Sequence, residues 1–228
     1  MRLARPTLDF AATASDPALS RAFWEGELGA RFEREFALAG GGTQHRLALA
    51  GSSIKLNVGQ PAPANAPLAG WRVLVVARAG LAAPRRLRDP DGNRVELVPP
   101  GHEGVTGLAM RMVVRSLAAH RRFFAGALGL AEVVPGRFAC GESLLLVEEG
   151  ADAPEDAGLA GLAGPGWRYP TIQVMRLAEA HDAALAGGAR VGWEPALTPG
   201  HARYSMLRDP DGNWIELAQR ADLAGTLD

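Results

Sequence analysis

Two polar side chains in apolar surroundings are the first candidates for chemistry. Arg111 lies in the apolar run 108–113, where strand alternation places it on the same face as Ala109. On a face that lines a cavity, its guanidinium could hold a carboxylate, phenolate or phosphate by forked hydrogen bonds; the alternative is an ion pair with Glu216. His201 follows Thr-Pro-Gly and precedes a strand pattern. It could act as a general base because imidazole titrates near neutral pH.

Aromatic and acidic side chains extend this set of candidates. Aromatic rings stack on flat ligands, although packing in a core is their more common role. The rings that could line a ligand site are those of Tyr169, Tyr204, Trp167, Trp193 and Trp214. Asp9 could act as a base in a cavity that excludes water, or it could lie on the surface at the end of a strand.

The chain repeats itself, and the repeat shows which elements carry these residues. The segment LRDPDGNRVEL at 87–97 returns as LRDPDGNWIEL at 207–217. Shorter matches follow the same order, at 23–29 with 123–129 and at 70–72 with 166–168. We infer two homologous units, roughly 1–101 and 104–228, joined at a Pro-Pro-Gly segment.

Each unit has the pattern of a strand, a helix and three further strands. Asp16, followed by proline, predicts the start of the first helix, and Ser116 predicts the start of its partner. Each unit ends on a strand entered through a Pro-Asp-Gly-Asn turn. A second helix, 176–186, is predicted in the second unit alone, because the segment between Trp71 and Asp89 is too short to hold one. The first unit is therefore truncated in its second half.

Composition excludes several classes of protein. The 228 residues are 47% hydrophobic and 21% charged, which is an ordinary globular composition. The net charge of -1 argues against a nucleic-acid or anionic-membrane surface. Neither a run of about 18 apolar residues nor an N-terminal apolar signal core is present, so we expect a cytoplasmic protein without a transmembrane helix. Cys140 is the only cysteine, which excludes an internal disulfide and a cysteine-based metal cage.

The Asp-Pro-Asp-Gly-Asn-x-x-Glu-Leu endings at 89–97 and 209–217, together with the Phe-aromatic…Leu-Gly openings, resemble the vicinal oxygen chelate superfamily. This group includes glyoxalase I, bleomycin-resistance proteins, extradiol dioxygenases and methylmalonyl-CoA epimerase. The resemblance implies an α+β fold with two tandem glyoxalase-like units of paired βαβββ modules, which curve into a cup around a ligand. Unit 1–101 would be degenerate and unit 104–228 complete. The reaction is left open, because one fold hosts many chemistries.

The resemblance also implies where a metal would be held. Members that use a metal place His, Gln and Glu ligands on the first strand of each module and on the last strand of the unit. In this chain those positions fall on Asp9, near Val73, and on Glu96, Ala109, Tyr169 and Glu216, with mid-unit positions near Lys55 or Asn57 and near Leu145 or Val147. None of them holds a histidine, so no cofactor is favoured. If Fe, Ni, Zn or Mn were bound, the ligands would be Glu216, Glu96 and Asp9.

These residues support hypotheses from two functional classes. The first is a metal-free lyase or isomerase that acts on a small oxygenated or aromatic molecule, with its main site in the second unit. Its catalytic residues would be Glu216, Tyr169 and His201, and its substrate-binding residues Arg111, Tyr204, Trp214 and Trp167. The alternative is a metal-free binding or sequestering protein of the bleomycin-resistance type, and a further alternative is a metal-dependent extradiol-type dioxygenase. The expected partner is a small molecule, not nucleic acid or a membrane, and a homodimer is compatible with either class.

Overall fold

The computed structural model describes residues 1–38, 41–59, 65–198 and 201–227, and its elements form four consecutive modules. Module 1 contains β1 (Asp9–Ala14), α1 (Pro17–Gly26), β2 (Arg31–Ala37), β3 (Thr43–Leu49) and β4 (Ser52–Val58). Module 2 contains β5 (Trp71–Ala77), β6 (Arg85–Arg88) and β7 (Arg94–Val98). Module 3 contains β8 (Leu108–Val114), α2 (Leu117–Arg121) with its π-helical continuation η2 (Arg122–Ala127), β9 (Ala131–Val134), β10 (Arg137–Cys140) and β11 (Ser143–Glu149). Module 4 contains β12 (Trp167–Gln173), α3 (Leu177–Ala186), β13 (Arg190–Thr198), β14 (Ala202–Arg208) and β15 (Trp214–Arg220). Short helical turns connect or follow the modules, namely η1 (His102–Gly104), η3 (Ala157–Ala160) and α4 (Ala221–Ala224).

The helices begin where the sequence predicts them. The Asp16 carboxylate accepts hydrogen bonds from the backbone N–H groups of Ala18 and Leu19, so it caps α1. The Ser116 hydroxyl does the same for α2, accepting from the N–H of Ala119 at 3.3 Å. In module 2, β5 leads to β6 without a helix, which confirms the predicted truncation of the first unit.

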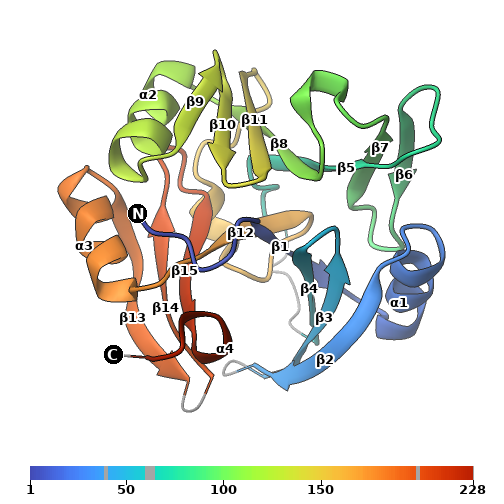
Figure 1. Cartoon of the computed structure of the whole chain (residues 1–228), viewed down its shortest axis with the longest axis horizontal. Helices are drawn as coiled ribbons and strands as arrows, with labels where there is room; N and C mark the ends of the chain where they lie inside the picture. Colours follow the sequence, from blue (N-terminus) through green and yellow to red (C-terminus); the bar gives the residue numbers. More distant parts are fainter. Residues whose placement is uncertain (39–40, 60–64, 199–200, 228) are drawn as a thin grey trace.

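The two sheets do not follow the two sequence units. The eight-stranded sheet has the order β13-β14-β15-β12-β1-β4-β3-β2 and so joins module 1 to module 4. The seven-stranded sheet has the order β6-β7-β5-β8-β11-β10-β9 and joins module 2 to module 3. Figure 1 shows the seven-stranded sheet above the eight-stranded one, with α2 and α3 on one side and α1 on the other. Each sheet therefore contains one module from each unit.

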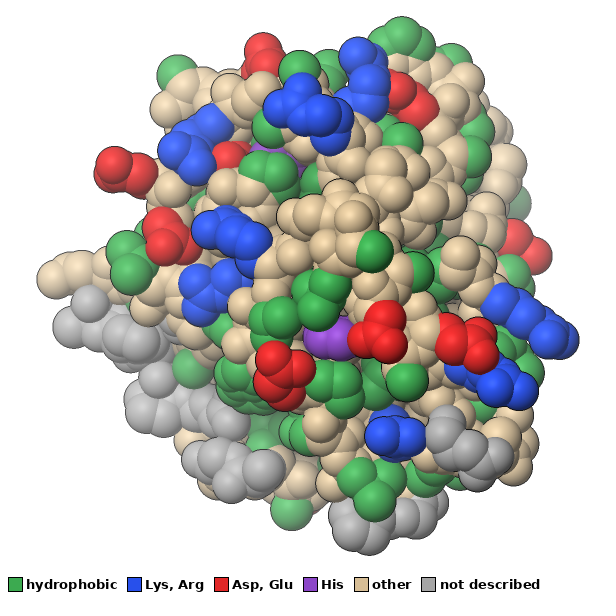
Figure 2. Space-filling view, turned by 90° about the vertical axis from the view of Figure 1, so that its left-hand side faces the viewer, with side chains coloured by type: hydrophobic (Ala, Val, Ile, Leu, Met, Phe, Trp, Pro, Cys, Tyr) green, Lys and Arg blue, Asp and Glu red, His purple; other side chains and the backbone are tan. Residues whose placement is uncertain are grey.

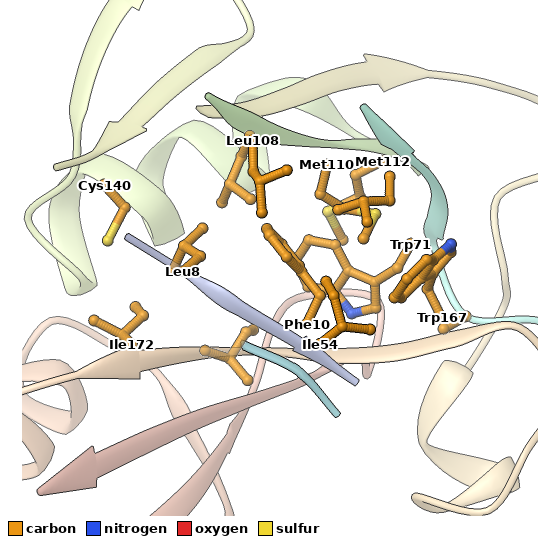
Figure 3. Packing of buried hydrophobic residues seen from close by; sticks show 14 of the residues in the cluster. Leu8, Phe10, Ile54, Trp71, Leu108, Met110, Met112, Cys140, Trp167 and Ile172 are labelled. Atoms are coloured by element: carbon orange, nitrogen blue, oxygen red, sulfur yellow. The ribbon is translucent and has the colours of Figure 1, made fainter. Parts of the chain in front are cut away.

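The hydrophobic core fills the space between the two sheets. Phe10 and Ile54 from the eight-stranded sheet pack in one cluster with Met110 and Met112 from the seven-stranded sheet (Figure 3). Trp167 also lies in this core, and its side chain is 1% exposed. Because side chains alternate along a strand, the residues between these core positions point to the outer face of each sheet. Any ligand site on the sheets is therefore on an outer face.

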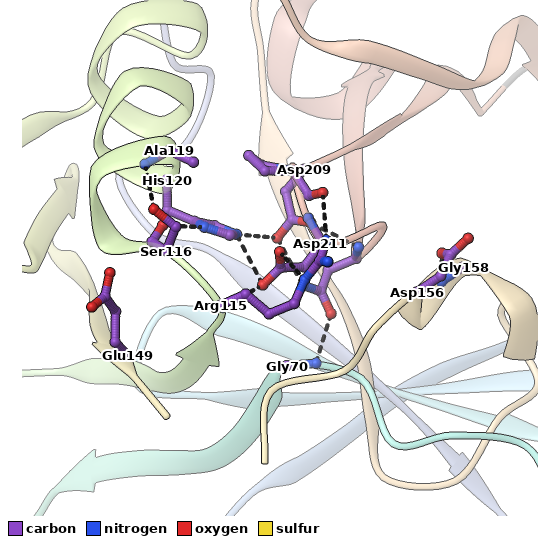
Figure 4. Close-up of polar contacts among 12 residues, drawn as sticks. Gly70, Arg115, Ser116, Ala119, His120, Glu149, Asp156, Gly158, Asp209 and Asp211 are labelled. Atoms are coloured by element: carbon purple, nitrogen blue, oxygen red, sulfur yellow. Dashed lines mark hydrogen bonds and ion pairs between the residues drawn. The ribbon is translucent and has the colours of Figure 1, made fainter. Parts of the chain in front are cut away.

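Polar contacts hold the two modules of each unit together. In the second unit, His120 of α2 contacts Asp209 in the turn before β15, and Arg115 contacts Asp211 in the same turn (Figure 4). In the first unit, the hydroxyl of Ser20 on α1 donates to Asp91, which occupies the same position in the repeat as Asp211. The repeat thus preserves a helix-to-turn contact, although its chemistry differs between the units.

The surface shows no dominance of one charge on the side seen in Figure 2. Acidic and basic side chains are interspersed there with apolar ones. Three of the exposed apolar side chains belong to the edge strand β13, namely Val191, Trp193 and Leu197. In the described part of the chain, no helix has the length and apolar character needed to cross a membrane.

Candidate functional site

A cavity of about 470 Å³ lies on the outer face of the eight-stranded sheet, and both sequence units line it. Module 1 contributes residues of β2, β3 and β4, and module 4 contributes residues of β12 to β15 and of the following α4. The lining residues are Arg34, Phe36, Ala37, Leu38, Gln44, Arg46, Asn57, Leu162, Tyr169, Trp193, Thr198, His201, Ala202, Tyr204, Met206, Glu216, Arg220, Ala221 and Asp222. The expectation that the second unit holds the main site by itself is wrong for this cavity, because the sheet pairs module 4 with module 1.

Lys55, Thr171 and Glu216 form a connected group at the inner end of the cavity. The Lys55 ammonium donates to Oε2 of Glu216 at 2.5 Å and to Oγ1 of Thr171 at 2.7 Å. The Thr171 hydroxyl donates to the same Glu216 oxygen at 2.5 Å. Lys55 and Thr171 are buried, whereas Glu216 keeps 15% of its side chain exposed. The hydrogen bonds from Lys55 and Thr171 to Glu216 thus share one carboxylate oxygen, Oε2. Glu216 is the member of the group that lines the cavity.

Strand pairing explains how residues so far apart in the sequence meet. Thr171 of β12 is paired with Glu216 of β15 in a parallel ladder. Thr171 is also paired with Asp9 of β1. Ala11, which lies two residues after Asp9 on the same strand, is paired with Lys55 of β4. Residues opposite each other in a ladder project to the same face, so the side chains of four strands converge there.

The charges of this group stabilise one another. Burial alone would raise the pKa of Glu216, but the Lys55 ammonium, the hydrogen bonds from Lys55 and Thr171 and the charge of Arg46 outweigh it and lower that pKa. Burial lowers the pKa of Lys55 to about 8, although the neighbouring Glu216 charge opposes this. Glu216 is therefore ionised at neutral pH, and Lys55 is mostly protonated.

Tyr169 forms part of the wall above the Lys55 ammonium, which lies 5.7 Å from its ring centroid. Its phenol is hydrogen-bonded to the side chains of Asn57 and Gln44. Burial, followed by the nearby Glu216 charge, raises the pKa of Tyr169 well above its ordinary value. A phenol held in its neutral form can donate or accept a hydrogen bond, but it is a poor acid or base at neutral pH.

Other predicted site residues lie in different parts of the structure. His201 and Tyr204 line the cavity, with the His201 ring 5.9 Å from that of Phe36. The sequence places His201 after 198–200, of which residues 199–200 lie outside the described part. Trp214 is buried beside the cavity and packs with Trp193 at a centroid distance of 6.0 Å.

Trp167 is remote from the cavity wall. It belongs to the core between the sheets, where its ring meets that of Trp24 at 5.9 Å. Its indole N–H donates to the backbone carbonyl of Arg94. This is the packing role that the sequence left open for the aromatic residues.

Arg111 lies on the other sheet and forms a different ion pair from the one considered in the sequence. Its guanidinium binds Glu96 at 3.0 Å and also contacts Glu103, so the pairing with Glu216 is wrong. Although burial opposes it, the hydrogen bonds with Glu103 and Glu96 raise the pKa of Arg111. Around it, the outer face of the seven-stranded sheet is filled by an apolar cluster that includes Val105 from the connection between the units. Arg111 still borders an open hollow beside β6 and β7.

The residues at the implied metal positions do not fit a divalent metal. Asp9 is fully buried and already accepts from the Ser53 N–H at 2.7 Å, from the Gln173 amide at 2.8 Å and from Arg5. Glu96 is on the other sheet, so it cannot join Asp9 and Glu216. The Lys55 ammonium is a cation, not a ligand. In the described residues, no group of three His, Cys, Asp or Glu side chains is arranged to hold a metal ion.

The cavity wall also contains residues that the sequence did not single out, chiefly Gln44, Arg46 and Arg220. Arg46 lies with its guanidinium 4.5 Å from the Phe36 ring centroid, and its Nε donates to Gln44 at 2.9 Å. Arg220 is 8% exposed and pairs with Asp222. In β4 the available signal was the alternation of Lys55 and Asn57 with apolar residues, as in a strand with one face in water. In β3 it was a run of four polar residues, 43–46.

The fold defines a class of α+β proteins in which βαβββ modules pair to form curved sheets. The model of the Glyoxalase/Bleomycin resistance protein/Dioxygenase superfamily matches residues 108–217, which is the part of the chain whose motifs predict this resemblance most completely. The comparison with curated protein sequences gave no match.

Solved structures show the same architecture along the chain. Glyoxalase I from Zea mays superposes with a TM-score of 0.71 at 14% identity, over 96% of this chain and 92% of that one. A putative dioxygenase from Bacillus subtilis gives a TM-score of 0.66 at 12% identity, over 100% and 91%. The cppA protein from Streptococcus pneumoniae gives 0.54 at 9% identity, over 96% and 100%. At these identities the likeness establishes the fold and not the activity, so the predicted tandem α+β fold is confirmed.

Proposed function

We propose that this protein binds a small organic molecule, without a metal ion, in the cavity of the eight-stranded sheet. The observation that carries the proposal is the Lys55–Glu216 pair at the inner end of a partly aromatic cavity. A volume of about 470 Å³ lies in the range of small-molecule sites. The pair supplies a fixed carboxylate that can orient a ligand.

The protonation states favour binding over acid–base catalysis. A catalytic acid or base works best when its pKa lies near the working pH. Here the pKa of Glu216 is lowered and that of Tyr169 is raised, so neither group changes its charge near neutral pH. This supports the sequestering hypothesis over the lyase or isomerase hypothesis, and in our proposal Glu216 and Tyr169 bind the ligand.

One observation favours the enzyme as a second candidate. Lys55 has a pKa of about 8, and it contacts the carboxylate that faces the ligand. A proton could therefore pass from Lys55 through Glu216 to a bound substrate, which is the chemistry of a metal-free lyase or isomerase. Product formation from a bound compound would select this candidate, whereas stoichiometric binding without turnover selects the first.

A ligand screen tests the binding function. A ligand at one hundred times its Kd stabilises the folded state by about 2.7 kcal/mol and raises the Tm of a chain of this size by about 5–10 °C. We expect Trp193→Ala, which removes part of the cavity wall, to lose most of this shift. Val134→Ala, at an exposed position on the edge strand β9, should keep it. Equal shifts in both variants would place the ligand outside the cavity.

Metal addition tests the proposed independence from metals. Because Lys55 stands among the implied ligand positions, we expect Fe, Ni, Zn and Mn to leave the Tm unchanged. Elemental analysis of protein purified without a His-tag should find far less than one metal ion per chain. A chelator-sensitive Tm with one metal per chain would instead support the dioxygenase hypothesis.

A cytoplasmic location and a homodimer remain predictions from the sequence.

A further inference from the structure

We infer that the ligand of this cavity is a small flat organic acid whose single carboxylate binds Arg46 and whose hydroxyl or N–H group binds Glu216. The inference rests on the proposed binding function and names the chemical class of the ligand. It follows from the charges in the cavity and from its aromatic wall.

Arg46 is the cation in the cavity wall without a carboxylate partner in the described residues. Its Nε is bound to the neutral amide of Gln44 at 2.9 Å, and no acidic group of the described chain lies within 4.0 Å of the guanidinium. Burial lowers the pKa of Arg46, and the charges of Arg220 and Arg34 act in the same direction, although the charge of Glu216 opposes them. A half-buried guanidinium with no carboxylate in direct contact can gain a favourable partner from an anion that enters this cavity.

The other cations near the cavity each have a carboxylate partner. Lys55 binds Glu216 at 2.5 Å. Asp222 is shared by Arg220 and, at 3.5 Å, by Arg34. Because Arg34 and Arg220 share one carboxylate, part of their positive charge remains, but each has an acidic partner, which Arg46 lacks in the described residues.

The ionised Glu216 favours a monoanion over a dianion at Arg46. A guanidinium binds a carboxylate through two parallel hydrogen bonds, which matches one negative charge with one positive charge. A dianion such as a phosphate monoester would bring a second negative charge near the ionised Glu216, whose field Arg46 already experiences. A carboxylate therefore fits this cavity better than a phosphate.

The shape and the second polar end of the site define the rest of the ligand. Phe36, Tyr169, Trp193 and Tyr204 make an aromatic wall, against which a flat ring can stack. Glu216 binds Lys55 and Thr171 through Oε2, which leaves its other oxygen to accept from a ligand. A hydroxyl or N–H group on the ring, away from the carboxylate, completes the match.

Calorimetry with matched probes tests the inference. The probes are 4-hydroxybenzoate, 4-hydroxycinnamate and 6-hydroxy-2-naphthoate, each with its neutral carboxamide, and phenyl phosphate as the dianion. We expect at least one acid to bind about tenfold more tightly than its amide, and phenyl phosphate to bind more weakly than the acids. Arg46→Gln should weaken binding of the acid about 10- to 100-fold and leave binding of the amide within about twofold. Arg46→Lys, which keeps the charge but not the fork, should fall between Arg46→Gln and the wild type.

The controls separate this inference from the proposed function. Arg176→Gln removes an exposed arginine far from the cavity wall and should bind every probe as the wild type does. Circular dichroism shows whether Arg46→Gln is folded. If other compounds bind in the cavity but no acid is preferred over its amide, or if Arg46→Gln binds acids normally, the inference is overturned and the binding function stands. If no compound of any class binds, the proposed function itself fails.

Discussion

Replacing Lys55 with methionine is expected to lower the free energy of unfolding by about 3 kcal/mol. The substitution keeps an unbranched side chain but removes the ammonium, so Glu216 loses its counter-ion. A carboxylate left unpaired in a buried site costs several kcal/mol of stability. Because 15% of the Glu216 side chain is exposed, the expected loss is at the lower end of that range. Urea denaturation at 25 °C measures the change.

Two further variants show whether the loss comes from the charge of Glu216. Adding Glu216→Gln to Lys55→Met removes the unpaired charge and should restore most of the stability. Arg176→Met breaks an exposed ion pair with Glu179 and should cost at most about 1 kcal/mol. A Lys55→Met protein as stable as Arg176→Met would show that the Lys55–Glu216 pair does not have the role assigned to it.

The pH dependence of Lys55 reports a different quantity, namely the cost of burying its ammonium, which outweighs the attraction of Glu216. Its pKa falls from 10.5 to about 8 on folding, so between these values the unfolded chain binds the additional proton. The contribution of Lys55 to stability is therefore complete above pH 10.5 and is lost as pH falls to about 8. Because Lys55 is the only lysine in the sequence, lysine isotope labelling gives a single side-chain NMR signal, whose titration midpoint should lie near 8.

The repeat made much of the fold predictable, because it identifies modules before any pairing is known. The helix starts at Asp16 and Ser116 and the truncation of the first unit all follow from local sequence. The pairing of modules does not, since it depends on contacts such as that of Lys55 with Glu216, which are 161 residues apart. Local patterns contain no information about which of four similar modules pair.

This long-range pairing also explains what happened to the predicted site. Strand alternation predicted Arg111 on the same face as Ala109, lining the ligand cavity, but β8 belongs to the seven-stranded sheet and Arg111 is not among the lining residues of the cavity described above. Glu216 and Tyr169, which the sequence proposes as catalytic residues, both line the cavity, because both belong to module 4. Lys55 was recognised only as a position in the implied metal set. Arg46 was missed because the polar run 43–46 in β3 looks the same whether it meets water or a cavity.

The turn residue Asp209 offers the second large effect, and the repeat supplies its control. Asp209 is fully buried and accepts hydrogen bonds from the N–H groups of Asp211 and Asn213, from the Asn213 amide and from His120. Its counterpart Asp89 accepts the equivalent three bonds within its own turn, but no histidine. We expect Asp209→Ala to cost about 4 kcal/mol of unfolding free energy and Asp89→Ala about 2 kcal/mol.

The difference arises because His120 is charged. Its Nδ1 faces the Ser116 carbonyl at 2.9 Å and its Nε2 faces Asp209 at 3.1 Å, so both ring nitrogens have acceptors and both can donate. Although burial opposes it, the hydrogen bond and charge of Asp209 raise the pKa of His120. Asp209→Ala then leaves a buried imidazolium without its main counter-ion, and Ser20 at the matching place on α1 creates no such charge. Urea denaturation of both variants, with and without His120→Gln, measures the coupling energy between His120 and each aspartate. We expect a large coupling energy with Asp209 and none with Asp89. Equal losses of stability in the two turns would contradict this account.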